Sequence, residues 1–154
     1  MKHWILAFAA LATGCAHPKC CDVIDTAVHI TYRDASGGDW LRTNNVTAEK
    51  MENYSVCGGT KTRVFQGNYD APKMLRLYRE PDTARTTLQV YPNDCGAAVE
   101  ESVTLLEFPD HSVDTLRCRF DHHDGNVVCT AARYNGKLRW SNQQGGIRAF
   151  TVTK

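Results

Sequence analysis

The sequence contains a run of potential metal ligands, Asp121-His122-His123-Asp124, with His111 a short distance upstream. Imidazole and carboxylate groups in one place can bind zinc or copper. Neighbouring residues on a strand point to opposite faces, however, so two consecutive histidines share an ion only where they lie in a turn. The run also has the composition of an ordinary polar turn. We expect such a turn here, and a metal site that uses His122 and His123 is the alternative.

A second set of reactive side chains would suit nucleophilic catalysis, in which a cysteine needs a histidine base and an orienting carboxylate. Cys57 or Cys95 with His111 and Asp114 would supply these groups. The chain has no Gly-x-Ser-x-Gly elbow, His-Glu-x-x-His pair, phosphate-binding loop or dinucleotide fingerprint. We therefore expect no enzyme and no cofactor.

The first fifteen residues have the pattern of an export signal. Lys2 precedes the apolar run from Trp4 to Ala12, and nine apolar residues are too few for a permanent transmembrane helix, which needs about 20. The small residues Thr13 and Gly14 then stand directly before Cys15. The segment Leu11-Ala12-Thr13-Gly14-Cys15 resembles a bacterial lipobox.

This resemblance implies removal of residues 1–14 as a signal peptide and acylation of Cys15. The protein would then be anchored by lipid in a bacterial cell envelope, and Ala16, where Asp would retain it, favours the outer membrane. Several acyl chains on one residue give stable anchoring without a protein span. We expect residues 15–22 to form the anchor and a spacer, and residues 23–154 to form one domain. The alternative is cleavage after Ala16 and release of a soluble, disulfide-rich domain.

Six cysteines remain once Cys15 carries lipid, and in an oxidising compartment disulfides are the default. Cys118 and Cys129 flank a polar four-residue turn, in a register that would place them opposite each other, so we expect them to pair. Cys20 or Cys21 could then join Cys57 or Cys95, but the sequence does not decide how these four cysteines pair. The spacing of the cysteines lacks the two-residue gap of a zinc knuckle.

The charge of the chain argues against nucleic-acid binding. The formal net charge of +1 falls to zero when Lys2 leaves with the signal, and basic and acidic residues are mixed along the sequence. Nucleic-acid binding draws most of its affinity from clustered positive charge. We expect the membrane, through the lipid anchor, and an envelope protein or a glycan as partners.

Short alternating or β-branched runs separated by turn residues predict an all-β fold, an antiparallel, disulfide-stapled β-sandwich of the immunoglobulin-like or a related kind. Turn pairs such as Asp124-Gly125 and Asn135-Gly136 tolerate the positive φ of tight hairpins. The best helix candidate is Val46–Asn53. The expected strands are Thr26–Arg33, Lys61–Gln66, Lys73–Tyr78, Thr86–Tyr91, Val99–Phe108, Asp114–Phe120, Asn126–Tyr134, Lys137–Ser141 and Ile147–Thr153.

A loop rich in oxygen-bearing residues and the two tryptophans beyond the signal could each serve either the fold or a ligand. The segment Asp34–Asp39 has oxygen-bearing residues at alternating positions, as in a calcium loop, but lacks a terminal bidentate acid, so we expect a hairpin loop. Of the tryptophans beyond the signal, Trp40 and Trp140, at least one should be buried between the sheets. We expect Trp140 to be the exposed one, available to a ligand.

The chain from Cys15 onwards resembles small, uncharacterised all-β lipoproteins of bacterial envelopes. The resemblance depends on Cys15, on the turn Gly37-Gly38-Asp39 after the first strand, and on two late hairpins, around residues 113–116 and 134–137. It implies a tethered sandwich domain of unassigned role, and it supplies no catalytic residue. We expect a non-enzymatic binding or structural module.

Overall fold

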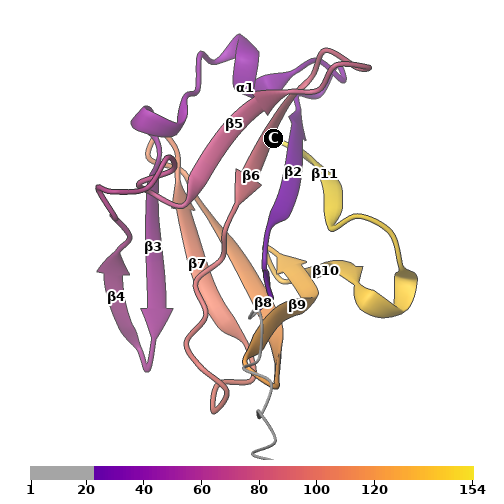
Figure 1. Cartoon of the computed structure of the whole chain (residues 1–154). Coiled ribbons are helices and arrows are strands. Elements are labelled where there is room, and N and C mark those ends of the chain that lie inside the picture. The colour runs from indigo at the N-terminus through magenta and orange to yellow at the C-terminus, as the bar shows by residue number, and fades with distance from the viewer. Residues whose placement is uncertain (1–22) are drawn as a thin grey trace, which may run out of the picture.

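A computed structural model describes residues 23–154, and two β-sheets packed against each other make up most of it (Figure 1). The helical segments are α1 (Trp40–Thr43) and the 3-10 turns η1 (Ala48–Lys50) and η2 (Asn142–Gln144). In this part of the chain no helix has the length and apolar character needed to cross a membrane. The strands are β1 (Ile24–Asp25), β2 (Val28–Arg33), β3 (Glu52–Cys57), β4 (Thr60–Arg63), β5 (Leu75–Arg79), β6 (Thr86–Val90), β7 (Ser102–Glu107), β8 (Val113–His123), β9 (Asn126–Tyr134), β10 (Lys137–Ser141) and β11 (Ala149–Thr153).

The larger sheet has seven strands in the order β1-β9-β8-β7-β3-β4, and β10 also pairs with β9. β1 and β10 pair with different stretches of β9, so β9 has three neighbours. The smaller sheet has the order β11-β2-β6-β5. Most pairs are antiparallel, as expected, but β1 with β9 and β11 with β2 run parallel. The predicted all-β sandwich is therefore confirmed, with mixed rather than purely antiparallel sheets.

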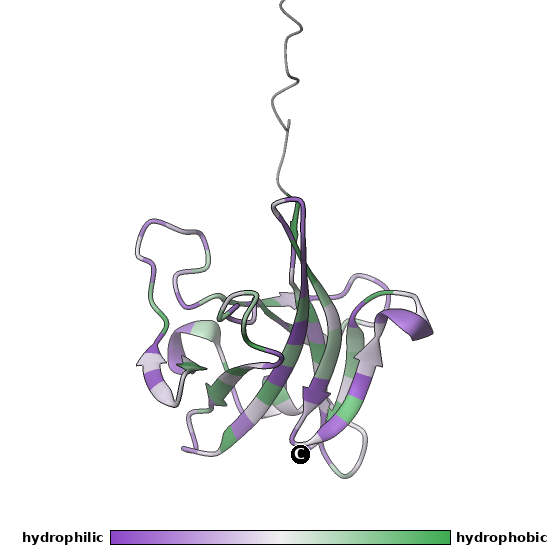
Figure 2. Cartoon of the chain, turned by 90° about the horizontal axis from the view of Figure 1, so that it is seen from below, coloured by the Kyte–Doolittle hydropathy of each residue, from purple (hydrophilic) through white to green (hydrophobic). Residues whose placement is uncertain are grey.

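The alternation of apolar and polar residues decides which face of each sheet is buried, and Figure 2 shows this alternation along the strands. On β2, Val28, Ile30 and Tyr32 are fully buried, while His29 and Thr31 between them point to the other face. Successive side chains of a strand point to opposite faces, so one strand supplies both core and surface. All nine predicted strands are present, as β2 and β4 to β11, with ends shifted by a few residues.

Polar groups at the centre of the core form a connected network. The hydroxyls of Tyr32 and Tyr134 lie 2.5 Å apart, and the Tyr134 hydroxyl donates to Asp114 Oδ2 at 2.6 Å. Asn135 and Lys154 also reach the Asp114 carboxylate, at 2.9 and 3.0 Å. Burial raises the pKa of both tyrosine hydroxyls, so they act as neutral hydrogen-bonding groups. The network joins the two sheets, because Tyr32 belongs to β2 and Tyr134 to β9.

The predicted helix at Val46–Asn53 is wrong. The structure has only η1 there, followed at Glu52 by strand β3, which pairs with both β4 and β7. Met51 and Asn53 are buried against the core. Glu52 and Asn53 pair with Glu107 and Leu106 of β7, and this pairing overrides the weak helical preference at the end of the segment.

The register predicted for Cys118 and Cys129 is wrong, although their side chains interact with each other. The strands β8 and β9 continue to a two-residue turn at Asp124-Gly125, so Cys118 lies opposite Ala132 and Cys129 opposite Phe120. The two cysteines are buried free thiols in the structure. An extra residue in β9, Thr130, creates a bulge that turns Cys129 inwards, and sequence alternation alone does not reveal such a bulge.

Candidate functional site

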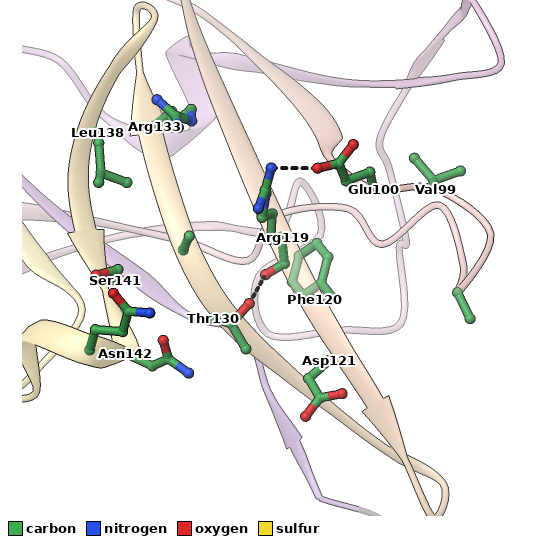
Figure 3. Close-up of a pocket in the computed structure, with 13 residues that line it drawn as sticks. Val99, Glu100, Arg119, Phe120, Asp121, Thr130, Arg133, Leu138, Ser141 and Asn142 are labelled. Carbon is green, nitrogen blue, oxygen red and sulfur yellow. Dashed lines mark hydrogen bonds and ion pairs between the residues drawn. The ribbon is translucent and has the colours of Figure 1, made fainter.

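A groove of about 590 Å³ crosses the outer face of the larger sheet over β8, β9 and β10. Figure 3 shows its main side chains. Arg119 comes from β8, Thr130 and Arg133 from β9, and Leu138 from β10. Arg119 and Arg133 point outwards because their strand neighbours Cys118, Ala132 and Tyr134 are buried. The register shift between Leu138 and Trp140 places Leu138 on this same face although Trp140 is buried.

Two arginines on one wall of the groove are held by acidic residues from the loop before β7. Arg119 Nη2 donates to Glu100 Oε1 at 2.5 Å, the contact drawn in Figure 3. Glu101 Oε1 accepts hydrogen bonds from Arg119 Nε at 3.4 Å and from Arg133 Nε at 3.2 Å. The ion pairs fix the positions of both guanidinium groups and leave this wall nearly neutral.

The opposite wall carries polar side chains from η2 that have no hydrogen-bond partner among the described residues. They are the amides of Asn142 and Gln143. The turn that presents them is well defined, because Ser141 and Gln144 form a reciprocal capping box around it. Such amides can each donate and accept hydrogen bonds with a ligand.

A second depression, of about 570 Å³, adjoins the first one. Asp121, Thr130 and Asn142 line both, so the two form one continuous surface that continues to Trp140 and Arg148. We call the two together the joined groove.

Arg148 organises the second depression. Its guanidinium pairs with the Asp25 carboxylate, donates to the carbonyl of Ala27 at 3.0 Å and lies 5.5 Å from the Trp140 ring centroid. The Arg148 side chain is only 11% exposed. These contacts tie β1, β10 and the segment before β11 together at one end of the sandwich.

Trp140 is not the exposed aromatic residue that the sequence suggested. Its exposure is 8%, and its indole nitrogen donates to the carbonyl of Gly145 at 3.3 Å. Trp140 packs against the segment that follows β10, through Gly145 and Arg148. It lines the joined groove as a wall rather than as an exposed platform.

Cys129 and His29 also line the second depression, without forming a catalytic pair. The hydrogen bond with Cys118 lowers the pKa of Cys129, against the effect of burial and with help from the Arg148 cation. The same interaction, together with burial, raises the pKa of Cys118. His29 instead bonds through Nδ1 to the Tyr78 hydroxyl at 3.1 Å, and burial is the main cause of its lowered pKa. Nucleophilic catalysis needs a base within hydrogen-bond reach of the nucleophile, and the hydrogen-bond partner of His29 is Tyr78.

The histidine run lies at the tip of the β8–β9 hairpin and does not converge on one point. His122 Nε2 lies 2.8 Å from Asp94 Oδ2, and His123 Nε2 lies 2.9 Å from Asp124 Oδ2. The two imidazoles thus pair with different carboxylates. Among residues 23–154, no group of three or more metal-ligating side chains comes together.

The set considered for nucleophilic catalysis is dispersed. Cys57 and Cys95 form a disulfide with a Cα–Cα distance of 5.6 Å, so neither pairs with Cys20 or Cys21, the alternative that the sequence left open. His111 is 89% exposed in a turn, while Asp114 belongs to the buried network. Cys15, Cys20 and Cys21 lie outside the described residues.

The calcium-like segment is a hydrogen-bonded loop. Asp34 Oδ1 accepts hydrogen bonds from the backbone of Ser36 and Gly38 and from the Ser36 hydroxyl. These bonds lower the pKa of Asp34. Asp39 caps α1 and accepts from the backbone of Thr86. Both carboxylates therefore serve the fold, as the hairpin-loop interpretation predicts.

Comparison of the chain with protein-family models, with curated proteins and with solved structures gave no significant match. The joined groove itself was not predicted from the sequence. Its residues come from five separate segments, and only the outward positions of Arg119 and Arg133 on predicted strands gave a signal.

Proposed function

We propose that this protein is a lipid-anchored bacterial envelope protein whose β-sandwich binds a partner without catalysing a reaction, through the joined groove. The observation that carries the proposal is the groove itself, because its rim offers the free amides of Asn142 and Gln143 beside fixed guanidinium groups. Polar groups that are fixed in place but still free to bond are what a binding site needs for orientation and specificity.

The arrangement of the reactive groups supports binding over catalysis. The Cys129 thiol interacts with Cys118, the His29 ring bonds Tyr78, and the Asp114 carboxylate is used inside the core. Each is occupied by a structural contact, whereas the groove amides are not. A protein or a glycan of the envelope is the partner class that we propose.

Photo-crosslinking tests the groove. A photoreactive amino acid in place of Gln143 should yield a defined adduct in intact cells, because this side chain lies on the rim of the groove. The same substitution at Arg76, an exposed position on the outer face of the smaller sheet, is the matched control. Equal crosslinking at both positions, or none at Gln143, would refute the proposed site.

The anchor is tested separately by metabolic labelling with a fatty-acid analogue. The wild-type protein should be labelled and the Cys15→Ser variant should not. An unlabelled wild-type protein would instead favour the soluble, secreted form. Labelling of both proteins would show that Cys15 is not the acylated residue.

A further inference from the structure

We propose that the outer face of the larger sheet, beside the joined groove, docks an acidic protein segment in which apolar side chains alternate with carboxylates. This inference rests on the proposed binding function and names the chemistry of the partner. It depends on the register of six strands. One row of outward side chains crosses the sheet in the order Lys61, Val56, Val103, Arg117, Arg133 and Leu138.

Arg117 and Arg133 occupy directly opposite positions on β8 and β9, with both side chains on the solvent face. Like charges directly opposite each other across two strands are destabilising. Glu101 partly relieves the repulsion by bonding Arg133, but within residues 23–154 no carboxylate pairs with the exposed Arg117. The protein alone thus leaves one positive charge without compensation at the centre of this face.

A second cation lies at the far end of the same row. Lys61 Nζ lies 3.8 Å above the Tyr54 ring, and none of the described carboxylates forms an ion pair with it. Arg63, its neighbour on β4, is already bound by Glu52 at 2.7 Å. The two uncompensated cations are therefore Arg117, near the middle of the row, and Lys61, at its end.

The surface between these cations is apolar. Val56 and Val103 separate Lys61 from Arg117 in the row, and Tyr54 lies opposite Leu105 in the next row. All four are partly exposed on strands whose other face is buried. Aliphatic side chains bounded by cations match a partner that alternates apolar and acidic side chains, whereas a neutral glycan would leave both the charges and the apolar surface unpaired.

Fluorescence anisotropy of the full-length chain in detergent micelles tests the inference with a labelled peptide of alternating leucine and glutamate. The wild-type protein should bind this peptide and not a matched leucine-lysine peptide. Arg117→Glu should weaken binding by roughly fivefold or more, because it reverses a central charge of the interface. Arg76→Glu makes the same charge change on the smaller sheet and should alter binding by less than about twofold.

Three results would overturn the inference: no binding of the acidic peptide, equal weakening by both variants, or equal binding of the basic peptide. A further experiment adds vesicles of phosphatidylglycerol. If the protein binds these vesicles but not the peptide, and Arg117→Glu abolishes vesicle binding, the inference is overturned and the partner of this face is an anionic membrane. Crosslinking from a photoreactive amino acid at position 143 distinguishes failure of this inference from failure of the proposed binding function. If it persists at the wild-type level in Arg117→Glu, the inference fails while the binding function stands.

Discussion

Removal of the Tyr134 hydroxyl is a sharp test of the polar network in the core. Tyr134 donates its single proton to Asp114, so the Tyr32 hydroxyl must donate to Tyr134. Tyr134→Phe removes both bonds and leaves the Tyr32 hydroxyl, in a side chain with no exposed surface, without an acceptor. Tyr32→Phe is milder, because Tyr134 keeps its bond to Asp114.

The free energies of unfolding follow from these contacts. A buried hydroxyl without a partner costs about 1–3 kcal/mol, and a lost hydrogen bond to a carboxylate costs about 1.5–3 kcal/mol. We expect Tyr134→Phe to destabilise the domain by about 3 kcal/mol and Tyr32→Phe by about 1 kcal/mol. The double variant has no orphaned hydroxyl, so it should be more stable than Tyr134→Phe by about 1 kcal/mol.

Urea unfolding followed by tryptophan fluorescence measures these differences, and thermal unfolding provides a second readout. For a domain of this size, 1 kcal/mol corresponds to a change in Tm of about 3–4 °C. The decisive comparison is the effect of Tyr32→Phe in the two backgrounds. If Tyr32→Phe destabilises the Tyr134→Phe protein as much as it does the wild type, the hydroxyls are energetically independent and the reasoning is refuted.

Three further predictions concern charge and sulfur. The hydrogen bond from Arg63, aided by Lys73, lowers the pKa of Glu52 from 4.5 to about 2. Its contribution to stability is therefore present above about pH 4.5 and is lost as the pH falls through about 2. In urea unfolding, Glu52→Gln should be less stable than the wild type at pH 7, and this difference should be much smaller at pH 2.5, whereas a constant difference would contradict the prediction. The disulfide of Cys57 closes a loop with a sequence separation of 38, so Cys57→Ala should lower the free energy of unfolding by about 4 kcal/mol in the same assay. A decrease below about 1 kcal/mol would show that the disulfide contributes little to stability. Alkylation of unfolded, unreduced protein followed by peptide mapping should label Cys118 and Cys129, whereas the pairing expected from the sequence would leave both unlabelled.

The strands could be predicted because the core is built from simple alternation. Val28, Ile30 and Tyr32 bury one face of β2, and this period of two is visible in the sequence. The helix prediction failed at Val46–Asn53, where pairing with β4 and β7 decides the structure. β4 follows β3 after the two-residue turn Gly58-Gly59, but β7 begins only at Ser102, so local propensity does not reveal the pairing with β7.

The histidine run shows how far the sequence alone could predict the candidate sites. The sequence indicated a polar turn, and the structure pairs His122 with Asp94, a residue 28 positions away. The disulfide partner of Cys57 was likewise undecided, because six cysteines allow fifteen pairings and only spatial proximity chooses one.

The sequence by itself determined the fold class, the place of most strands and the mixed charge of the chain, because these properties depend on residue type and short-range period. The tertiary structure alone decided the disulfide, the inward turn of Cys129 and the joined groove. The bulge at Thr130 changes the face to which Cys129 points, and the register between β8 and β9 sets Arg117 opposite Arg133. The bulge and the register are set where the two strands of one hairpin pair, and the disulfide and the groove by contacts between segments far apart in the sequence. Residue type and alternation encode neither kind of contact.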